Sequence, residues 1–402
     1  MNEPNIRING FNNAWEKAKI GDITKSFSGG TPAVSVKDFY DGEIPFIRSG
    51  EIHEDKTQLK ITYKGLKFSS AKYVEKGTLL YALYGATSGE VDLAKISGAI
   101  NQAILAIIPN EEYDKFFLCS FLEARKSWII STLLQGGQGN LSGNLVKNID
   151  VCYPPFSEQQ EIANFFKSLD LMITLTSKKI EKLKQTLTGC MQTMFPQEGE
   201  LEPKVRFKGF DGEWKSIPLK EIAKKKTDKN VGVKYDITLT NSAEYGVINQ
   251  RDFFDHDISN SNNIGGYYII DNDDFVYNPR ISVTAPVGPI NRNQLGYTGI
   301  MSPLYLIFSV DGINIDYLSC FFKTTLWHNY MKLNGNSGAR FDRLAISDDA
   351  FFKMPIAVPQ DSKEQLRIAN YFKSLNEIIS LQTKRLDLLK HIKSACLDNM
   401  FV

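Results

Sequence analysis

The sequence has few of the residues that build metal sites and disulfides. Its five cysteines are scattered along 402 residues, at Cys119, Cys152, Cys190, Cys320 and Cys396. None forms a C-x-x-C pair, so we expect neither a zinc site nor a disulfide framework. Free thiols fit a reducing compartment, and we expect the protein to be cytoplasmic. The four histidines are also isolated, without metal-ligand spacing: His53, His256, His328 and His391.

Motifs of nucleotide-binding and hydrolytic enzymes are also missing. The sequence contains no G-x-x-x-x-G-K-[ST], no glycine-rich dinucleotide fingerprint after a strand and no G-x-S-x-G. Asn278-Pro279-Arg280-Ile281 distantly resembles the Asn-Pro-Pro-Tyr motif of amino-methyltransferases, but it lacks the second proline and the aromatic residue. We interpret it as a turn at the end of a strand. These absences favour a binding protein over an enzyme and predict no catalytic residue, metal or cofactor on this chain.

Neither long apolar runs nor an excess of charge characterises the chain. No stretch approaches the ~18 apolar residues of a membrane span, and the polar residues 1–13 predict no signal peptide. The formal net charge is +1, which is not typical of proteins that bind nucleic acid by bulk charge. Three alternatives stay open: the chain does not bind nucleic acid, local patches do, or partners neutralise much of the phosphate charge.

The chain contains an internal duplication. Residues 158–195 align without a gap to residues 364–401, and 17 of the 38 aligned positions are identical. The opening of each half also repeats: Gly10-Phe11 with Trp15 corresponds to Gly209-Phe210 with Trp214. The regions between these frames, roughly 20–150 and 220–355, align poorly. Similar frames with dissimilar inserts indicate two related modules with different targets.

The two repeated segments predict long helices with a heptad seam. The seam residues of the first are Ile162, Phe166, Leu169, Ile173, Thr176, Ile180 and Leu183, and those of the second are Ile368, Phe372, Leu375, Ile379, Gln382, Leu386 and Leu389. Thr176 and Gln382 are polar residues at matched positions that could fix the register. Ser157 with Gln160, and Ser362 with Gln365, have the spacing of a capping box.

Two packing arrangements fit these helices. Each could pack on its own domain, or the two could pair with each other, which the length of both stripes favours. An antiparallel pair would relate the tandem copies by a pseudo-twofold axis. A seam of about 33 residues would be roughly 50 Å long and would act as a rigid spacer.

The variable regions predict β-rich domains. Short apolar runs between turn residues indicate strands at 44–47, 78–84, 103–108, 267–270 and 304–308. Shorter helices are expected at 115–135 and 315–333, each followed by a loop rich in Gly and Asn. The fold class is therefore α/β (α+β), with domain 1 at 1–156, a helix at 157–196, domain 2 at 197–358 and a second helix at 359–402.

Polar residues in these loops are candidates for reading DNA bases, because Gln, Asn and Arg bond base edges bidentately. The candidates of the first module are Arg48, Ser49, Thr87, Ser88, Gln102, Gln135, Gln138 and Asn140. Those of the second are Asn278, Arg280, Ser282, Thr284, Arg340 and Arg343. For any one of them taken singly, a solvated or turn-forming residue is the favoured alternative, and the prediction rests on the set as a whole. A basic run could contact phosphates or form a solvated helix face: Lys220, Lys224, Lys225, Lys226 and Lys229.

The combination resembles the specificity subunits of Type I restriction-modification enzymes. The resemblance covers nearly the whole chain and rests on the Phe11/Trp15 opening, the segments 47–52 and 84–89, and the motif Pro-x-x-Glu158-Gln159-x-x-Ile162 with its second copy ending in Glu364-Gln365-x-x-Ile368. The second module departs in its middle, where residues 280–288 replace the Gly-Ala-Thr-Ser-Gly turn.

The resemblance implies that each variable region is a target recognition domain for one half of a bipartite site in double-stranded DNA. It also implies that the helices set the spacer and dock two DNA methyltransferase subunits, which methylate adenine, while motor-nuclease subunits add restriction. S-adenosylmethionine and ATP would bind to these partners, and no membrane is involved. Two rivals are a scaffold or decoy that binds methyltransferase subunits without reading DNA, and an enzyme with an unfamiliar site.

Overall fold

The computed structural model describes residues 3–133, 140–253, 264–336 and 342–402, without the side chains of residues 252 and 253. The chain forms two compact units. Unit 1 comprises Met1–Lys178 and Thr383–Val402, and unit 2 comprises Lys179–Gln382. None of the helices in the described ranges is long and apolar enough to cross a membrane.

Unit 1 is a mixed α/β domain. Its strands are β1 Glu16–Lys19, β2 Thr24–Ser28, β3 Tyr40–Ile47, β4 Lys60–Ile61, β5 Lys72–Val74, β6 Leu79–Ala82, β7 Val91–Leu93, β8 Gly98–Ile100, β9 Ile104–Pro109 and β10 Asp150–Tyr153. Its shorter helices are α1 Ile20–Ile23, α2 Tyr63–Lys67, α3 Lys115–Leu133 and α4 Gly143–Lys147. Two four-stranded sheets result, with the orders β2-β9-β6-β7 and β4-β3-β8-β5.

Unit 2 repeats part of this plan. Its strands are β11 Lys215–Pro218, β12 Ala223–Lys226, β13 Leu239–Ser242, β14 Gly246–Asn249, β15 Tyr268–Ile270, β16 Phe275–Tyr277, β17 Ile290–Arg292, β18 Gly299–Met301, β19 Leu306–Val310 and β20 Pro355–Val358. Its shorter helices are α6 Gln250–Phe253, α7 Ile315–Phe322, α8 His328–Asn334 and α9 Asp348–Phe352.

The topology confirms the duplication. The sheet β12-β19-β16-β17 has the same order of equivalent strands as β2-β9-β6-β7. The strand after each repeated tryptophan pairs antiparallel with the strand before each long helix, β1 with β10 and β11 with β20. The remaining strands differ, since the sheet β4-β3-β8-β5 has no four-stranded counterpart among the described strands of unit 2.

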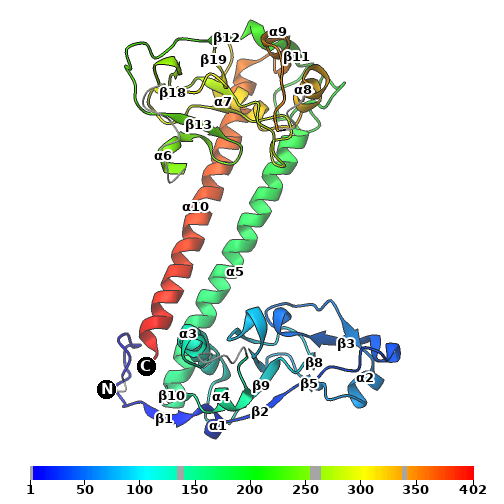
Figure 1. Ribbon diagram of the computed structural model, residues 1–402, viewed down its shortest axis with the longest axis vertical. Helices are drawn as coiled ribbons and strands as arrows, with labels where there is room; N and C mark the ends of the chain where they lie inside the picture. Colours follow the sequence, from blue (N-terminus) through cyan, green and yellow to red (C-terminus); the bar gives the residue numbers. More distant parts are fainter. Residues whose placement is uncertain (1–2, 134–139, 254–263, 337–341) are drawn as a thin grey trace. The chain divides into compact units, whose positions relative to one another are not determined.

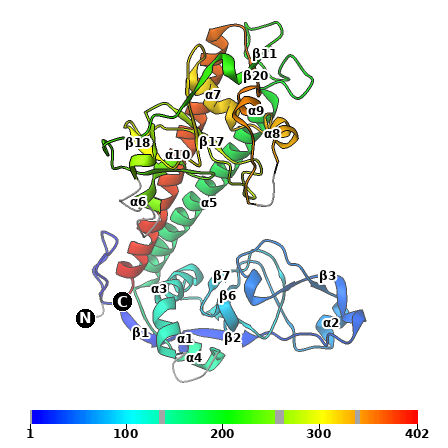
Figure 2. The same ribbon diagram turned by 45° about the horizontal axis from the view of Figure 1, so that its top comes forward.

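The long helices are α5, Phe156–Thr193, and α10, Ser362–Met400. They lie side by side in Figures 1 and 2. Every predicted seam residue is buried or half-buried, including the polar Thr176 and Gln382. The predicted seam face is therefore buried along both helices, as a heptad pattern requires. In the first turns it is buried in the domain cores, which contain Ile162 and Phe166 in unit 1 and Ile368 and Phe372 in unit 2.

The phenylalanine that follows each long helix packs beside the first turns of the other helix. In unit 1, the Phe401 ring stacks on Phe166 with 5.7 Å between ring centroids and an angle of 23° between the planes. In unit 2, Phe195 stacks on Phe372 at 6.1 Å and 25°. Both pairs connect the end of one helix to the start of the other, so the helices are antiparallel, as predicted.

The capping-box prediction is wrong. Helix α5 already begins at Phe156, and α10 begins at Ser362, so neither serine precedes its helix. Asp361 takes the capping position of α10, where its carboxylate accepts the backbone N–H of Lys363 at 2.8 Å. Its carbonyl oxygen accepts the N–H groups of Glu364 and Gln365.

Two repeated glutamines attach the helix starts to their domains. The side-chain amide of Gln159 donates to the carbonyl of Pro154 at 2.9 Å, and its oxygen accepts the N–H of Asp114, just before α3. Gln365 repeats both bonds with Pro359 and Asn314, just before α7. These buried amides tie the first turn of each long helix to the residues before it and to the start of α3 or α7.

The secondary structure of the inserts mostly follows the prediction. Each predicted strand overlaps an observed one, β3, β6, β9, β15 and β19. The helix expected at 115–135 is α3. The helix expected at 315–333 is instead two helices, α7 and α8, because Phe322–Trp327 forms a turn that buries Trp327 and bonds its indole N–H to the Phe322 carbonyl.

Substituting Phe401→Ala should destabilise unit 1, because the ring also contacts Phe117 and Phe121 of α3. Removing a buried phenylalanine typically lowers the free energy of unfolding by about 3–5 kcal/mol. Faster hydrogen exchange at α3 and β10 would report this loss of stability in unit 1. Phe195→Ala is the equivalent change in unit 2. Phe68→Ala is the control, since Phe68 is 65% exposed. Unchanged protection in Phe401→Ala would contradict the packing described.

Candidate nucleic-acid interface

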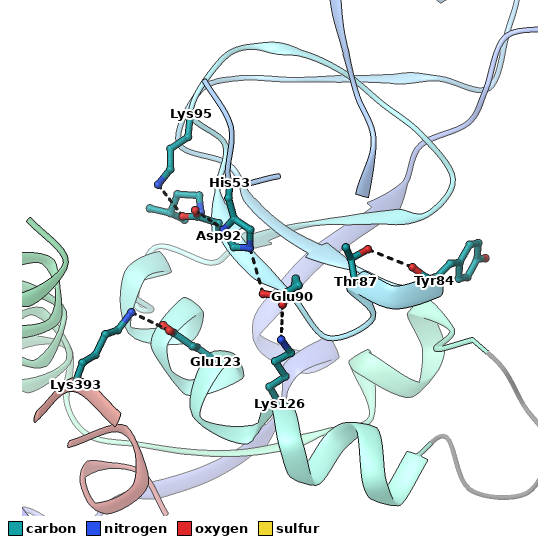
Figure 3. A network of polar contacts seen from close by, with 10 residues as sticks. His53, Tyr84, Thr87, Glu90, Asp92, Lys95, Glu123, Lys126 and Lys393 are labelled. Atoms are coloured by element: carbon teal, nitrogen blue, oxygen red, sulfur yellow. Dashed lines mark hydrogen bonds and ion pairs between the residues drawn. The ribbon is translucent and has the colours of Figure 1, made fainter. Parts of the chain in front are cut away.

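The connection between β6 and β7 carries the predicted turn 84–89 of unit 1. Gly85 and Gly89 have φ angles of +74° and +82°, which side chains other than glycine rarely tolerate. The Ser88 hydroxyl is buried and bonds the carbonyl of Gly85 at 2.8 Å, so it lies inside the turn. Thr87 is half-buried, and its hydroxyl bonds the Tyr84 carbonyl at 3.4 Å (Figure 3).

Backbone hydrogen bonds join three loop segments at one edge of the first sheet. Leu83 donates to the carbonyl of Ala103 at 2.8 Å, and Leu141 donates to the carbonyl of Leu83 at 2.9 Å. Tyr84 and Asn140 form an isolated β-bridge. The candidates Gln102 and Asn140, which are exposed, therefore lie on segments adjacent to the turn that carries Thr87.

The other candidates of unit 1 lie one strand further. Strands β3 and β8 are parallel, and Ile47 lies beside Ile100. Arg48, just after β3, therefore lies at the same end of the sheet as Asn101 and Gln102, just after β8. The Arg48 guanidinium bonds Glu51 at 3.1 Å and Gln58 at 2.7 Å. Ser49 begins the short 3-10 turn between them. Arg48 is thus held by its neighbours rather than extended freely.

In unit 2, the connection between β16 and β17 pairs with the segment after α8. Arg280 and Arg343 form an antiparallel bridge, the equivalent of the Tyr84–Asn140 bridge. The guanidinium Nε atoms of Arg280 and Arg343 lie 4.0 and 3.8 Å from the Asp342 carboxylate. The structure therefore brings two predicted arginines together.

The remaining candidates of this connection have local partners. Asn278 bonds the carbonyl of Asn241 and accepts the N–H of Arg280, so its amide supports the turn. Ser282 and Thr284 are exposed, and their hydroxyl oxygens lie 3.2 Å apart. Gln135, Gln138 and Arg340 lie outside the described residues. That any of the fourteen candidates contacts a base stays a prediction.

The lysine run of unit 2 does not form a helix face, since only Lys220 lies in a helical turn, Leu219–Glu221, and the helix-face alternative is therefore wrong. Lys224, Lys225 and Lys226 belong to strand β12. Lys226 bonds Asp271 at 2.5 Å and Asp274 at 2.7 Å, and Lys225 bonds Asp348 at 2.5 Å. Lys220, Lys224 and Lys229 are exposed. Two of the five lysines are therefore already paired with carboxylates.

One pair of structural residues in each unit was missed by the sequence analysis. Arg7 forms a bidentate bond with the fully buried carboxylate of Glu158 in α5, at 2.7 and 2.8 Å. Arg206 does the same with Glu364 in α10, at 2.8 and 2.9 Å. The repeated pattern Arg-x-x-Gly-Phe, which precedes the tryptophan of each half, could have identified these arginines in the sequence. These pairs fix the opening segment of each half on its helix.

A network of charged side chains lies behind the turn of unit 1 (Figure 3). The His53 imidazole lies between Asp92, at 2.9 Å, and Glu90, at 3.2 Å. Glu90 directly follows the turn and also bonds Lys126 of α3. Asp92 also bonds Lys95 at 2.9 Å. His53 therefore links the segment after Arg48 to the strand after the turn.

The network borders a cavity of about 420 Å³ that also contacts the helices of unit 1. Across it, Lys393 of α10 bonds Glu123 of α3 at 2.8 Å and Asp170 of α5 at 2.7 Å.

The hydrogen bond to Asp92 raises the pKa of His53 above its usual value. Burial would raise the pKa of Asp92, but its bonds with His53 and Lys95 outweigh burial and lower it. Within the described part of the chain, no group of three potential ligands could hold a metal ion.

Because folding raises the His53 pKa, its stabilising effect is complete below the unfolded-state pKa and is lost as pH rises through the folded-state value. The free energy of unfolding should fall by about 0.2–1 kcal/mol over this range, the usual size for an exposed ion pair. His53→Gln should lack this dependence and His391→Gln should keep it, since His391 is exposed. Denaturant unfolding between pH 5.5 and 9, at about half-unit steps across the histidine range, provides the measurement. A full pH dependence in His53→Gln would refute the assignment.

Part of the chain matches a known protein family. Residues 12–185 match the family model of the Type I restriction modification DNA specificity domain. The chain is 27% identical over 214 residues to the Type I restriction enzyme MjaVIII specificity subunit of Methanocaldococcus jannaschii, covering 52% of this chain and 49% of that protein. It is 24% identical over 184 residues to the HindI specificity subunit of Haemophilus influenzae, covering 43% and 40%. The chain thus matches about half the length of these relatives or less.

A solved structure shares the fold over the full chain. The S subunit of a Type I restriction-modification system from M. genitalium has a TM-score of 0.62 and 15% identity, and the match covers 100% of this chain and 99% of that one. The family model, over residues 12–185, and the relatives agree: the chain is similar to Type I restriction-modification specificity subunits, and it shares its fold with the S subunit from M. genitalium.

Proposed function

We propose that this chain is the non-catalytic DNA-specificity subunit of a Type I restriction-modification system, in which each unit reads one half of a bipartite site in double-stranded DNA. The main observation behind the proposal is that the two units share one scaffold but differ in the loop that connects its last two strands, β6 with β7 and β16 with β17. Both units have the same four-stranded sheet, Arg–Glu pair and strand pair, but residues 83–90 and 278–289 differ in length and sequence.

The two edges offer different chemistry to a base. The edge of unit 1 combines the neutral polar side chains of Gln102 and Asn140, and such amides bond adenine bidentately. The edge of unit 2 pairs Arg280 with Arg343, and arginine suits guanine. Loops on a rigid scaffold are suited to such readout. The units would therefore recognise unlike half-sites, with the paired helices setting the unread spacer.

The outer faces of the long helices support docking of two methyltransferase subunits. Met172 and Leu175 of α5 are 46% and 57% exposed. Ile378 and Leu381 of α10, at the same repeat positions, are 42% and 63% exposed. Exposed apolar side chains that recur in both copies indicate two equivalent binding sites. Methylation of adenine would use S-adenosylmethionine on these partners, and motor-nuclease subunits with ATP would add cleavage in the cytoplasm.

Replacing residues 20–150 with the equivalent region of another specificity subunit should change one half of the methylated sequence and leave the other half intact. The methylated-base map of cells that express the chain with its methyltransferase provides the measurement. Replacement of residues 220–355 is the matched control and should change the opposite half. A change in both halves from one replacement would contradict the modular reading.

The docking face can be tested by stoichiometry. Met172→Gln with Leu175→Gln should reduce the number of bound methyltransferase subunits from two to one, and Ile378→Gln with Leu381→Gln should do the same at the other site. Mass measurement of the purified complex reports the number. Leu388→Gln is the control, because Leu388 is 59% exposed but corresponds to Lys182 in the other copy. Two bound subunits in both double variants would refute these sites.

The rival proposal is a scaffold or decoy that binds methyltransferase subunits without reading DNA. It predicts the same assembly but no sequence preference. An assembled complex that methylates no defined sequence, and binds unrelated DNA as tightly as any other, would favour this rival over the specificity subunit.

A further inference from the structure

Positive charge in unit 1 is concentrated around α2. Residues 56–76 contain six lysines and one glutamate, a net charge of +5, whereas the whole chain carries +1. The rest of the chain therefore has a net charge of −4. All six lysines are exposed. A chain that is nearly neutral overall thus has a strongly basic segment.

Large aromatic side chains are exposed between these lysines. Tyr63 is 77% exposed and Phe68 is 65% exposed. The Lys67 ammonium lies 5.8 Å from the centre of the Phe68 ring. Of the lysines around α2, Lys64 bonds the exposed Asp38 at 3.1 Å, while none of the described carboxylates pairs with Lys60 or Lys67. We call Lys60, Tyr63, Lys64, Lys67 and Phe68 the α2 surface.

The fold holds this surface in place from beneath. The Thr62 hydroxyl accepts the N–H of Gly65 at 3.0 Å and donates to the carbonyl of Asp38 at 2.8 Å. A Cβ atom on Gly65 would lie 2.4 Å from the Phe39 carbonyl oxygen, so only glycine permits this approach. Leu66 packs on a small core that contains Phe46 and Ile61. The helix is therefore fixed with its polar face outward.

The position of α2 separates it from the candidate reading edge. Both views show α2 beside β3, at the end of unit 1 remote from α3 (Figures 1 and 2). The reading edge includes Asn140, which follows α3 closely in sequence and bridges Tyr84. The α2 surface is thus a second, distinct feature of the same unit.

Its chemistry suits the sugar-phosphate backbone better than base edges. Lysine is a point charge that attracts phosphate without fixing two hydrogen bonds at once. The surface contains neither arginine nor a side-chain amide, the groups that distinguish bases. The exposed aromatic rings add apolar surface that can contact the deoxyribose carbons of the backbone, whatever the sequence. Backbone contacts of this kind position a protein on the duplex.

We propose that the α2 surface binds the DNA backbone flanking the half-site read by unit 1 and supplies affinity without sequence preference. This inference rests on the proposed function. It also accounts for DNA binding by a chain of net charge +1, because the phosphate contacts depend on local charge rather than on the total.

The test uses the complex with its methyltransferase subunits and a duplex that contains the methylated sequence. Lys60→Gln with Lys67→Gln should make the plot of log affinity against log salt less steep by about 1.8, since each phosphate contact contributes ~0.9. Affinity at about 0.15 M salt should fall about 30-fold if the contacts act through counter-ion release alone. The methylated sequence should stay the same.

Lys17→Gln with Lys19→Gln is the matched control. It removes the same charge from the exposed face of β1 in the same unit, where Lys17 pairs with Asp150 at 2.8 Å and Lys19 bonds Asn148. Its salt dependence should be that of the wild type. An equal loss of slope in the control, or an unchanged slope in the α2 variant, would overturn the proposal.

The aromatic residues give a second, independent measurement. Tyr63→Ser with Phe68→Ser should lower affinity for specific and unrelated duplexes alike and leave the salt slope unchanged. Loss of methyltransferase subunits from either α2 variant would instead identify a protein-binding surface and overturn the proposal. A wild-type complex with no sequence preference would refute the proposed function, whereas normal wild-type binding with unaffected variants would refute this inference alone.

Discussion

Each domain of this protein is completed by the end of a helix that begins in the other half of the sequence. Phe401 stacks on Phe166 in unit 1, and Phe195 stacks on Phe372 in unit 2. The aromatic rings lie in the cores, so the helix ends cannot leave without opening a large cavity. The pairing of the helices, the burial of their seam and the attachment of the opening segments all depend on this exchange.

Local sequence patterns predicted the helices well. The period of the seam specified which face of α5 and α10 is buried, and the repeat made antiparallel pairing reasonable. The partners of Arg7 and Gln159 could not be found in this way. Glu158 is 151 residues from Arg7, and only the folded chain brings them together. The serines at 157 and 362 had the right spacing for caps, but both lie within their helices, and Asp361 caps α10.

The candidate interface was predicted less completely. Loop composition identified the segments that meet at the sheet edges, yet it could not separate side chains that face solvent from those that support a turn. Ser88 and Asn278 have the same character in sequence as Asn140, but their polar atoms bond nearby backbone groups. The lysines of β12 looked equally suitable for a helix, because a short charged run carries no clear period. Their carboxylate partners come from distant parts of the chain.

The exchange of helix ends has a consequence for synthesis. Unit 2 is one continuous segment, Lys179–Gln382, but unit 1 also requires Thr383–Val402. At a synthesis rate of about 5–20 residues per second, the ribosome needs roughly 11–45 s to make residues 179–402. Throughout that interval the aromatic site for Phe401 on α3 and α5 is uncovered. The domain made first is therefore finished last, and it is the one that nascent-chain chaperones and proteases have the longest time to encounter.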